Sequence, residues 1–280
     1  MIGFNHLGNL GRLGNQMFEF AALRGIVAKH GYDFCIPPST HKGIENYSLH
    51  QCFKLEHIPV GFIEGENYIG EKHFHYDKDL FDNCSDGKSL YGFFQSEKYF
   101  KHISHEIGKD FTFHDHIIEP CLEFISKLKE PIMLHVRRGD VNLTDSRGFK
   151  WSYVNCSDQH PVQPIEYYRK ALSYFGIGQP VIVFSDSPEW VEEQEFFAED
   201  RFHISKPHDK YADGSYTPYI DLCLMSMCSH AIIANSSMSW WGAWLIANPN
   251  KKVIAPHMWF GPAYADKDIK DLYVKKWIVL

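Results

Sequence analysis

The sequence predicts an α/β protein whose second half forms a doubly wound parallel sheet. Two observations carry this prediction. From residue 130 onward, short apolar runs alternate with helical segments, and polar clusters directly follow three of those runs. Apolar strands that alternate with helices are typical of parallel sheets covered on both faces.

The expected elements of the second half follow one another in a regular order. Pro164 and Gly176 mark the start and end of its first helix. Strands are expected at residues 131–136, 181–184, 202–205, 230–234 and 252–255, and helices at residues 164–175, 188–197, 218–229 and 238–247.

The first half shows one clear helix, at residues 15–30, with Gly31 as its expected C-terminal cap. A short β-like run follows at residues 32–36, and the region beyond it has no readable period. The change of pattern near residue 130 predicts two domains, residues 1–129 and residues 130–280.

The composition excludes several classes of protein. The chain has 280 residues with a net charge of −7, which argues against a nucleic-acid partner, because such a partner needs a basic face. Seven cysteines, without a CxxC spacing, suggest neither a disulfide framework nor a zinc site. Residues 1–10 do not resemble a signal peptide, and no apolar run approaches the length of a membrane span. A cytoplasmic protein is therefore expected.

Polar side chains cluster where three expected strands end. Arg137 and Arg138 follow the first strand, Asp186 follows the second, and the run Asn235-Ser236-Ser237 follows the strand at residues 230–234. Ligands of open parallel sheets bind at the carboxyl ends of the strands, so these clusters are expected to converge on one crevice.

Each cluster suits a nucleoside diphosphate. Paired arginines bind phosphate, and a helix N-terminus after Asn235 also attracts it. The carboxylate of Asp186 can accept the N1–H and N2–H donors of guanine. Each cluster also has a purely structural interpretation: the serines or Asp186 as helix caps, and the arginines as a surface pair.

Three tryptophans, Trp240, Trp241 and Trp244, lie within one expected helix. Such rings either stack on a base or sugar or fill a core. Core packing is favoured for Trp244, and both interpretations stay open for Trp240 and Trp241.

The segment His135-Val-Arg-Arg-Gly-Asp140 resembles the HxRRGD motif of the α-1,2-fucosyltransferases, glycosyltransferase family 11. The runs Gly11-Arg-Leu-Gly-Asn-Gln-Met17, Gly92-Phe-Phe-Gln-Ser-Glu-Lys-Tyr-Phe100 and Phe184-Ser-Asp186 are also similar to segments of that family. So is the stretch from Asp221 to Trp244. Val141 is a departure, because the family usually has an aromatic residue there.

The resemblance implies a GT-B fold, in which two Rossmann-like domains face a central cleft, and an inverting, metal-independent transfer from GDP-fucose. It implies that residues 1–129 form the acceptor-side domain and residues 130–280 the GDP-fucose-binding domain. The implied donor-binding residues are His135, Arg137, Arg138, Asp186, Asn235, Ser236 and Ser237, with Trp240 as a further candidate. Asn15 is implied to reach the fucose or the acceptor from the first domain.

Without a metal, a cationic side chain must stabilise the departing diphosphate, and Arg137 is expected to do so. An inverting transfer also benefits from a base beside the acceptor hydroxyl. Asp140 is one candidate, with the alternative role of orienting the arginines. Asp145 and Glu19 are two others.

The expected reaction is transfer of fucose to the 2-hydroxyl of a terminal galactose in an oligosaccharide or glycolipid. The alternatives are a related transferase with another acceptor or sugar nucleotide, or a non-catalytic glycan-binding module. No cofactor, metal or nucleic acid is expected. The chain is expected to act in the cytoplasm, at most peripherally at the inner membrane, in surface-glycan synthesis of a bacterium or virus.

Overall fold

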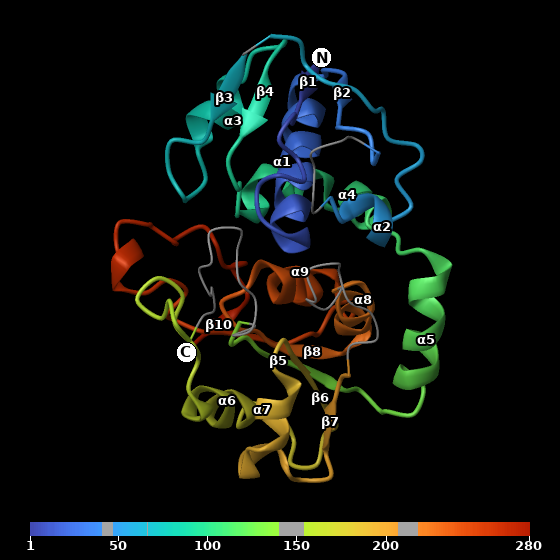
Figure 1. The fold of residues 1–280 in the computed structure, drawn as a ribbon, viewed down its shortest axis with the longest axis vertical. Helices are drawn as coiled ribbons and strands as arrows, with labels where there is room; N and C mark the ends of the chain where they lie inside the picture. Colours follow the sequence, from blue (N-terminus) through green and yellow to red (C-terminus); the bar gives the residue numbers. More distant parts are fainter. Residues whose placement is uncertain (41–46, 66, 140–153, 207–217) are drawn as a thin grey trace. The chain divides into compact units, whose positions relative to one another are not determined.

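The computed structural model is an α/β structure with two parallel sheets (Figure 1). It describes residues 1–40, 47–65, 67–139, 154–206 and 218–280.

The chain forms two compact units. Unit 1 comprises Met1–His114 and Lys267–Val274, and unit 2 comprises Asp115–Asp266 and Lys275–Leu280. The expected division at residues 129 and 130 differs from these bounds.

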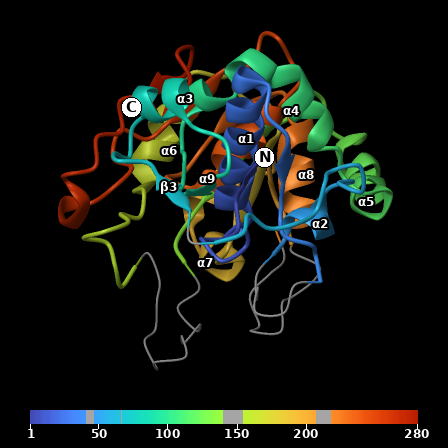
Figure 2. The same cartoon turned by 90° about the horizontal axis from the view of Figure 1, so that it is seen from above.

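Helix α5 (Asp115–Ile125) accounts for the first difference in bounds. It buries Ile117 and Cys121, which are one helical turn apart, and it lies beside α8 (Tyr219–Met227) of unit 2 (Figures 1 and 2). The helix therefore belongs to the same unit as its packing partner.

The segment Lys267–Val274 accounts for the second difference. Ser96 Oγ of unit 1 donates a 2.7 Å hydrogen bond to the carbonyl of Asp271. This contact joins residues far apart in the chain, so no local sequence pattern predicts it.

Unit 2 contains a six-stranded sheet in the order β10-β9-β8-β5-β6-β7, and every pairing in it is parallel. Its strands are β5 (Ile132–Val136), β6 (Val181–Ser185), β7 (Phe202–Ile204), β8 (His230–Ile232), β9 (Val253–Ala255) and β10 (Ile278–Val279). The chain runs outward from β5 through β6 to β7, then returns to the other side of β5 at β8. The strand order therefore reverses between β5 and β8.

Helices cover both faces of this sheet (Figure 1). Helices α6 (Ile165–Leu172) and α7 (Pro188–Glu192) pack on the face that carries Leu134 and Val136. Helix α9 (Ser237–Leu245) packs on the other face, where a Cβ added to Gly242 would meet the Met133 sulfur at 3.3 Å.

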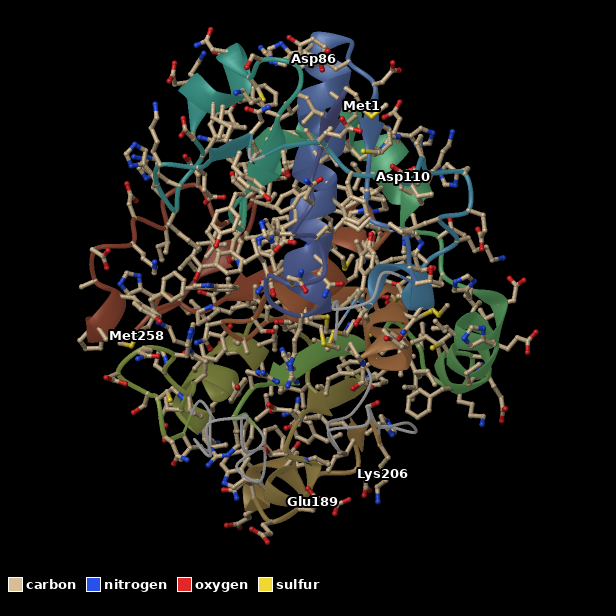
Figure 3. All side chains as sticks on the ribbon, turned by 45° about the horizontal axis from the view of Figure 1, so that its top comes forward. Met1, Asp86, Asp110, Glu189, Lys206 and Met258 are labelled. Atoms are coloured by element: carbon tan, nitrogen blue, oxygen red, sulfur yellow. The ribbon has the colours of Figure 1, made fainter. Side chains whose placement is uncertain are left out.

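Unit 1 contains a four-stranded parallel sheet in the order β2-β1-β4-β3. Its elements are β1 (Ile2–Gly3), α1 (Leu13–His30), β2 (Phe34–Cys35), α2 (Leu49–Cys52), β3 (Tyr68–Gly70), α3 (Lys78–Asn83), β4 (Ser89–Tyr91) and α4 (Ser104–Asp110), with 3₁₀ turns at Glu97–Tyr99 and Lys101–Ile103. The N-terminal ammonium group forms an ion pair with Asp86 of this unit (Figure 3).

The elements expected from the sequence are confirmed with small shifts of their ends. Helix α1 ends at Gly31, whose φ of 71° gives the left-handed cap that glycine favours. The helix expected at residues 188–197 is shorter, because α7 stops at Glu192 and a separate 3₁₀ turn covers Glu195–Phe197.

Candidate functional site

The three polar clusters lie at one edge of the unit 2 sheet. Arg137 directly follows β5, Asp186 directly follows β6, and Asn235 lies just beyond the end of β8. Because β6, β5 and β8 are parallel neighbours, their carboxyl ends meet at the same edge. The strand order also reverses between β5 and β8, and this reversal is where open α/β sheets bind their ligands.

Asp186 is the centre of the hydrogen bonding at this edge. Arg137 Nη1 donates to its Oδ2 at 2.6 Å. The backbone N–H groups of Arg138 and Gly139 donate to Oδ1 and Oδ2 at 2.9 and 2.7 Å. Three donors occupy most of the roughly four acceptor positions of a carboxylate. In this structure Asp186 therefore fastens the segment after β5, rather than offering both oxygens to guanine as the sequence suggested.

The two adjacent arginines have different surroundings. The Arg137 guanidinium is about one-fifth exposed and ion-pairs with Asp186. The Arg138 guanidinium lies 3.9 Å from the ring centroid of Trp190 in α7. Burial lowers the pKa of Arg138, although the charge of Asp186 opposes this shift. Arg138 is therefore held by a cation–π contact, and the pair is not the loose surface pair that was the alternative interpretation.

His135 lies within β5 and is buried. Burial lowers the pKa of its imidazole to about 4, with a raising contribution from Asp186 and a lowering one from Arg137. No described residue bonds to its Nδ1 atom. The imidazole is therefore neutral at physiological pH and has one nitrogen without a partner in the described part of the chain.

Helix α9 begins at this edge, and no side chain among the described residues caps its N-terminus. Ser236 is the N-cap residue, but its side chain makes no capping hydrogen bond, and the first turn contains no acidic residue. Ser236 and Ser237 are both half-buried. The first N–H groups of α9 and the helix dipole therefore favour an anion here. The alternative role of Ser236 as a side-chain cap is not seen.

Asn235 connects neighbouring segments of unit 2 through its side-chain amide. Its Nδ2 group donates to the carbonyls of Pro161 and Trp259 at 3.0 and 3.1 Å, and its Oδ1 accepts from Gln163 at 3.2 Å. Both amide protons are thus used by the protein. These contacts argue against direct donor binding through the amide protons of Asn235, and its assignment to the donor stays a prediction.

Trp240 is a core residue, and its assignment to donor binding is corrected. Trp240 and Trp241 are both 0% exposed, with ring centroids 5.1 Å apart. Trp240 also packs 5.3 Å from Trp277. A ring with no exposed face cannot stack on a base. Trp244, for which core packing was favoured, is the only half-buried member of the three.

The remaining described candidates belong to unit 1. Asn15 is half-buried near the start of α1, and its Oδ1 accepts a 2.9 Å hydrogen bond from Gln95.

Glu19 is 0% exposed, and neither carboxyl oxygen has a hydrogen-bond partner among the described residues. Burial, together with the charge of Glu71, raises the pKa of Glu19 well above its usual value. Burial therefore favours the neutral form of Glu19, and its carboxyl group is not exposed in this structure.

Asp140 and Asp145 lie outside the described residues. Among the residues described, no group of three or more His, Cys, Asp or Glu side chains is placed to hold a metal ion. No helix in that same part of the chain is long and apolar enough to cross a membrane.

The sequence analysis did not identify two further residues, Trp190 in unit 2 and Glu71 in unit 1. The Trp190 ring contacts Arg138. The sequence could have indicated Trp190, because it lies in the helix that begins two residues after Asp186. Glu71 directly follows β3 in unit 1, and burial raises the pKa of its carboxyl to about 8 although Phe94 and Phe93 donate to it. A strand as short as β3 gives no periodic signal that would identify Glu71.

Comparison with known proteins gives one family over nearly the whole chain. The model of glycosyl transferase family 11 matches residues 2–280. The chain is 28% identical to the O-antigen biosynthesis glycosyltransferase WbnK of Escherichia coli, over 96% of this chain and 98% of that protein. It is 27% identical to an alpha-1,2-colitosyltransferase of Escherichia coli, over 89% and 90% of the two chains. It is 26% identical to galactoside alpha-(1,2)-fucosyltransferase 2 of Pongo pygmaeus, over 84% and 67%.

Solved structures share the fold at low sequence identity. POFUT1 in complex with GDP superimposes with a TM-score of 0.53 at 14% identity, over 91% of this chain and 97% of that one. The NodZ alpha-1,6-fucosyltransferase co-crystallised with GDP gives 0.51 at 12% identity, over 86% and 90%. The expected GT-B type α/β fold, with a doubly wound parallel sheet in the C-terminal half, is confirmed.

Proposed function

The chain belongs to glycosyl transferase family 11, and from this premise we propose that it transfers fucose from GDP-fucose to the 2-hydroxyl of a terminal galactose. The observation that carries the proposal is the carboxyl edge of the unit 2 sheet. There Arg137, which forms an ion pair with Asp186, follows strand β5. The neighbouring strand β8 leads into the N-terminus of α9, where Ser236 makes no capping hydrogen bond.

This edge suits a nucleoside diphosphate as leaving group. The permanent charge of Arg137 and the N–H groups at Ser236 and Ser237 are fixed before a ligand arrives, so they stabilise developing negative charge without reorganising. We assign the β-phosphate to Arg137 and the rest of the diphosphate to the serines. No cofactor or metal takes part in this proposal, because the cationic and backbone groups supply the electrostatic stabilisation.

Guanine recognition is assigned to His135 and Asp186. Asp186 keeps about one acceptor position beyond its three donors, and the neutral His135 keeps Nδ1 as an acceptor or donor according to its tautomer.

Asn15 of unit 1 keeps its proposed role toward the fucose or the acceptor. Asp140 and Asp145 remain the proposed candidates for the base, whereas the burial of Glu19 argues against it.

The acceptor and the setting are proposed from the relatives. The colitosyltransferase is named for an α-1,2 linkage, the Pongo pygmaeus relative for an α-1,2 linkage with a galactoside, and WbnK for O-antigen biosynthesis. A galactose-terminated oligosaccharide or glycolipid of a bacterial surface glycan fits these names. We place the reaction in the cytoplasm, at most peripherally at the inner membrane.

A second candidate differs only in the sugar. The 27% identical alpha-1,2-colitosyltransferase aligns over 89% of this chain and 90% of its own, so activated colitose is the alternative donor. The nucleotide edge serves both donors, and the difference falls on the groups that contact the sugar.

The deciding experiment is a transfer assay with GDP-fucose and with nucleotide-activated colitose, against a panel of galactosides, with the linkage of the product determined by NMR. Acceptor-dependent release of GDP with an α-1,2-fucosylated product supports the proposal. Transfer of colitose alone selects the second candidate. Tight GDP binding without acceptor-dependent release indicates a non-catalytic glycan-binding module and overturns both.

A further inference from the structure

Unit 1 also gathers polar side chains at the carboxyl edge of its sheet. Helix α1, which carries Asn15, follows β1; Gln95 lies just beyond β4; and Glu71 directly follows β3. Strands β1, β4 and β3 are consecutive parallel neighbours. The three side chains therefore come from the same edge. Gln95 bonds directly to Asn15, and Glu71 bonds to the backbone of Phe94, the residue before Gln95.

Asn15 is held on two sides. Gln95 Nε2 donates to its Oδ1 at 2.9 Å, and Gln95 is itself only 8% exposed. On the other side lies Gly11, with a φ of 70°, where an added Cβ would stand 2.1 Å from Asn15 Nδ2. Because Oδ1 is occupied, the orientation of the amide is fixed. Its Nδ2 protons, for which the described residues supply no acceptor, remain the donating end.

Gln95 in turn depends on a strained turn. The preceding residue, Phe94, has a φ of 50°, a left-handed conformation that is sterically unfavourable for a bulky residue. Its ring is buried, in edge-on contact with Phe4 and Tyr99. Such a conformation persists only where its surroundings impose it.

Glu71 imposes that conformation. Its Oε2 accepts a short hydrogen bond from the backbone N–H of Phe94, and Phe93 donates a second backbone N–H to the same carboxyl group. The carboxyl also fills the space beside Gly92, where an added Cβ would lie 2.8 Å from Glu71 Cγ. The glycine and the carboxylate therefore fit each other, and together they set the path of the chain toward Gln95.

We infer that Glu71 is a positioning residue, which holds the Phe93–Phe94 turn and, through Gln95, fixes the amide of Asn15 for the transfer reaction. The inference rests on the proposed function, because the reaction that uses Asn15 is part of that proposal. Glu71 acts through backbone N–H groups and need not touch the substrate.

The test is a double-mutant cycle on the full-length enzyme. Glu71→Ala and Gln95→Leu each lower kcat by about 10- to 100-fold, the loss that misplacing a group by about 1 Å can cause. The KM for GDP-fucose changes by less than about 2-fold, because unit 2 binds the nucleotide in the proposed function. In an Asn15→Ala background either substitution causes little further loss, since coupled residues are not additive. Fully additive losses would overturn the inference.

Glu71→Gln separates positioning from a chemical role. The amide oxygen still accepts from Phe94, so this variant keeps kcat within about 5-fold of the wild type, as loss of one neutral hydrogen bond allows. A Glu71→Gln variant as impaired as Glu71→Ala means that the carboxyl group takes part in the chemistry as an acid or base, and the inference fails. Glu64→Ala, an exposed glutamate of the same unit, is the matched control.

A readout independent of turnover keeps this inference separate from the proposed function. Amide exchange at Phe93 and Phe94 should speed up in Glu71→Ala. The NMR order parameter of the Asn15 side-chain amide should fall in both Glu71→Ala and Gln95→Leu, and neither change should occur in Glu64→Ala. If Glu71→Ala does not fold, Gln95→Leu still tests the link to Asn15, and Glu71→Gln tests the turn. A wild type that transfers no fucose refutes the proposed function, whereas unchanged exchange refutes the positioning role.

Discussion

The Arg137 guanidinium and the Asp186 carboxylate, 49 residues apart in the chain, meet at 2.6 Å at the carboxyl edge of the unit 2 sheet. The same carboxylate receives two backbone N–H groups from the segment after β5. One side chain therefore orients both the guanidinium and the backbone that follows it. This makes Asp186 the residue on which the geometry of this edge depends.

Asp186→Asn should destabilise this edge. The amide NH₂ replaces an oxygen that accepts from N–H groups, so donor faces donor and the charge opposite Arg137 is lost. Hydrogen bonds to charged groups contribute about 1.5–3 kcal/mol, and we expect a loss of about 2 kcal/mol in the free energy of unfolding by urea. Affinity for GDP, measured by calorimetry, should fall as well. Asp200→Asn, at an exposed position in the same unit, should change neither quantity.

Arg137→Ala tests the leaving-group assignment. Loss of one preorganised electrostatic donor typically lowers turnover by about 10²–10³-fold. We expect that loss in kcat for fucose transfer and a weaker affinity for GDP. Arg169→Ala, which removes an exposed arginine from α6, is the matched control. Near-normal turnover in Arg137→Ala would contradict the assignment.

The sequence predicted the position of a site residue where a local pattern marks it, but it did not predict contacts with residues far away in the chain. Arg137, Asp186 and Ser236 were identified because each follows an apolar run, and parallel strands place such positions at one edge. The contacts made there are not local. Nothing near Asp186 reveals that the N–H groups of Arg138 and Gly139 occupy its oxygens, and nothing near Asn235 reveals the carbonyls of Pro161 and Trp259.

Trp240 and unit 1 show two other limits of the sequence. Helix α9 carries large apolar side chains on several faces, so its pattern does not tell a buried ring from one that contacts a ligand. In unit 1 every strand has two or three residues, which is too short for a period to appear. Gln95 and Glu71 could therefore be found only from the hydrogen bonds that the folded chain makes.

His135 should make stability depend on pH. Its pKa falls from 6.5 in the unfolded chain to about 4 in the folded protein, so the unfolded state binds more protons between these values. Stability is therefore fully present above pH 6.5 and is lost as the pH falls toward 4, by about 3 kcal/mol at about 1.4 kcal/mol per pKa unit. Urea unfolding at pH 7.5 and 4.5 should show a smaller difference for His135→Gln than for the wild type. Equal differences would mean that His135 is not buried as a neutral imidazole.

Glu19→Gln should have little effect on catalysis. The carboxyl group is buried, and burial raises its pKa and so favours its neutral form, which an uncharged amide of the same shape replaces. A raised pKa means that the wild type loses stability as the pH rises above 4.5, and Glu19→Gln should lose less. Transfer rates and urea unfolding at pH 5 and 8 check both expectations. A correctly folded Glu19→Gln variant without transfer activity would make Glu19 a base after all.

Ser237→Asp should change stability and ligand affinity in opposite directions. A carboxylate in the first turn of α9 interacts favourably with the uncapped N–H groups and the helix dipole, and such charges contribute about 0.3–1 kcal/mol to stability. The ligand-free protein should therefore become more stable in urea. The same carboxylate repels a diphosphate, so affinity for GDP should fall, and more steeply at low salt because the repulsion is electrostatic. Ser237→Ala removes the hydroxyl without adding charge, so it should weaken GDP binding only modestly and without the change in salt dependence. If Ser237→Asp binds GDP as tightly as Ser237→Ala, the diphosphate does not lie at the N-terminus of α9, and the assignment of this edge to the donor is wrong.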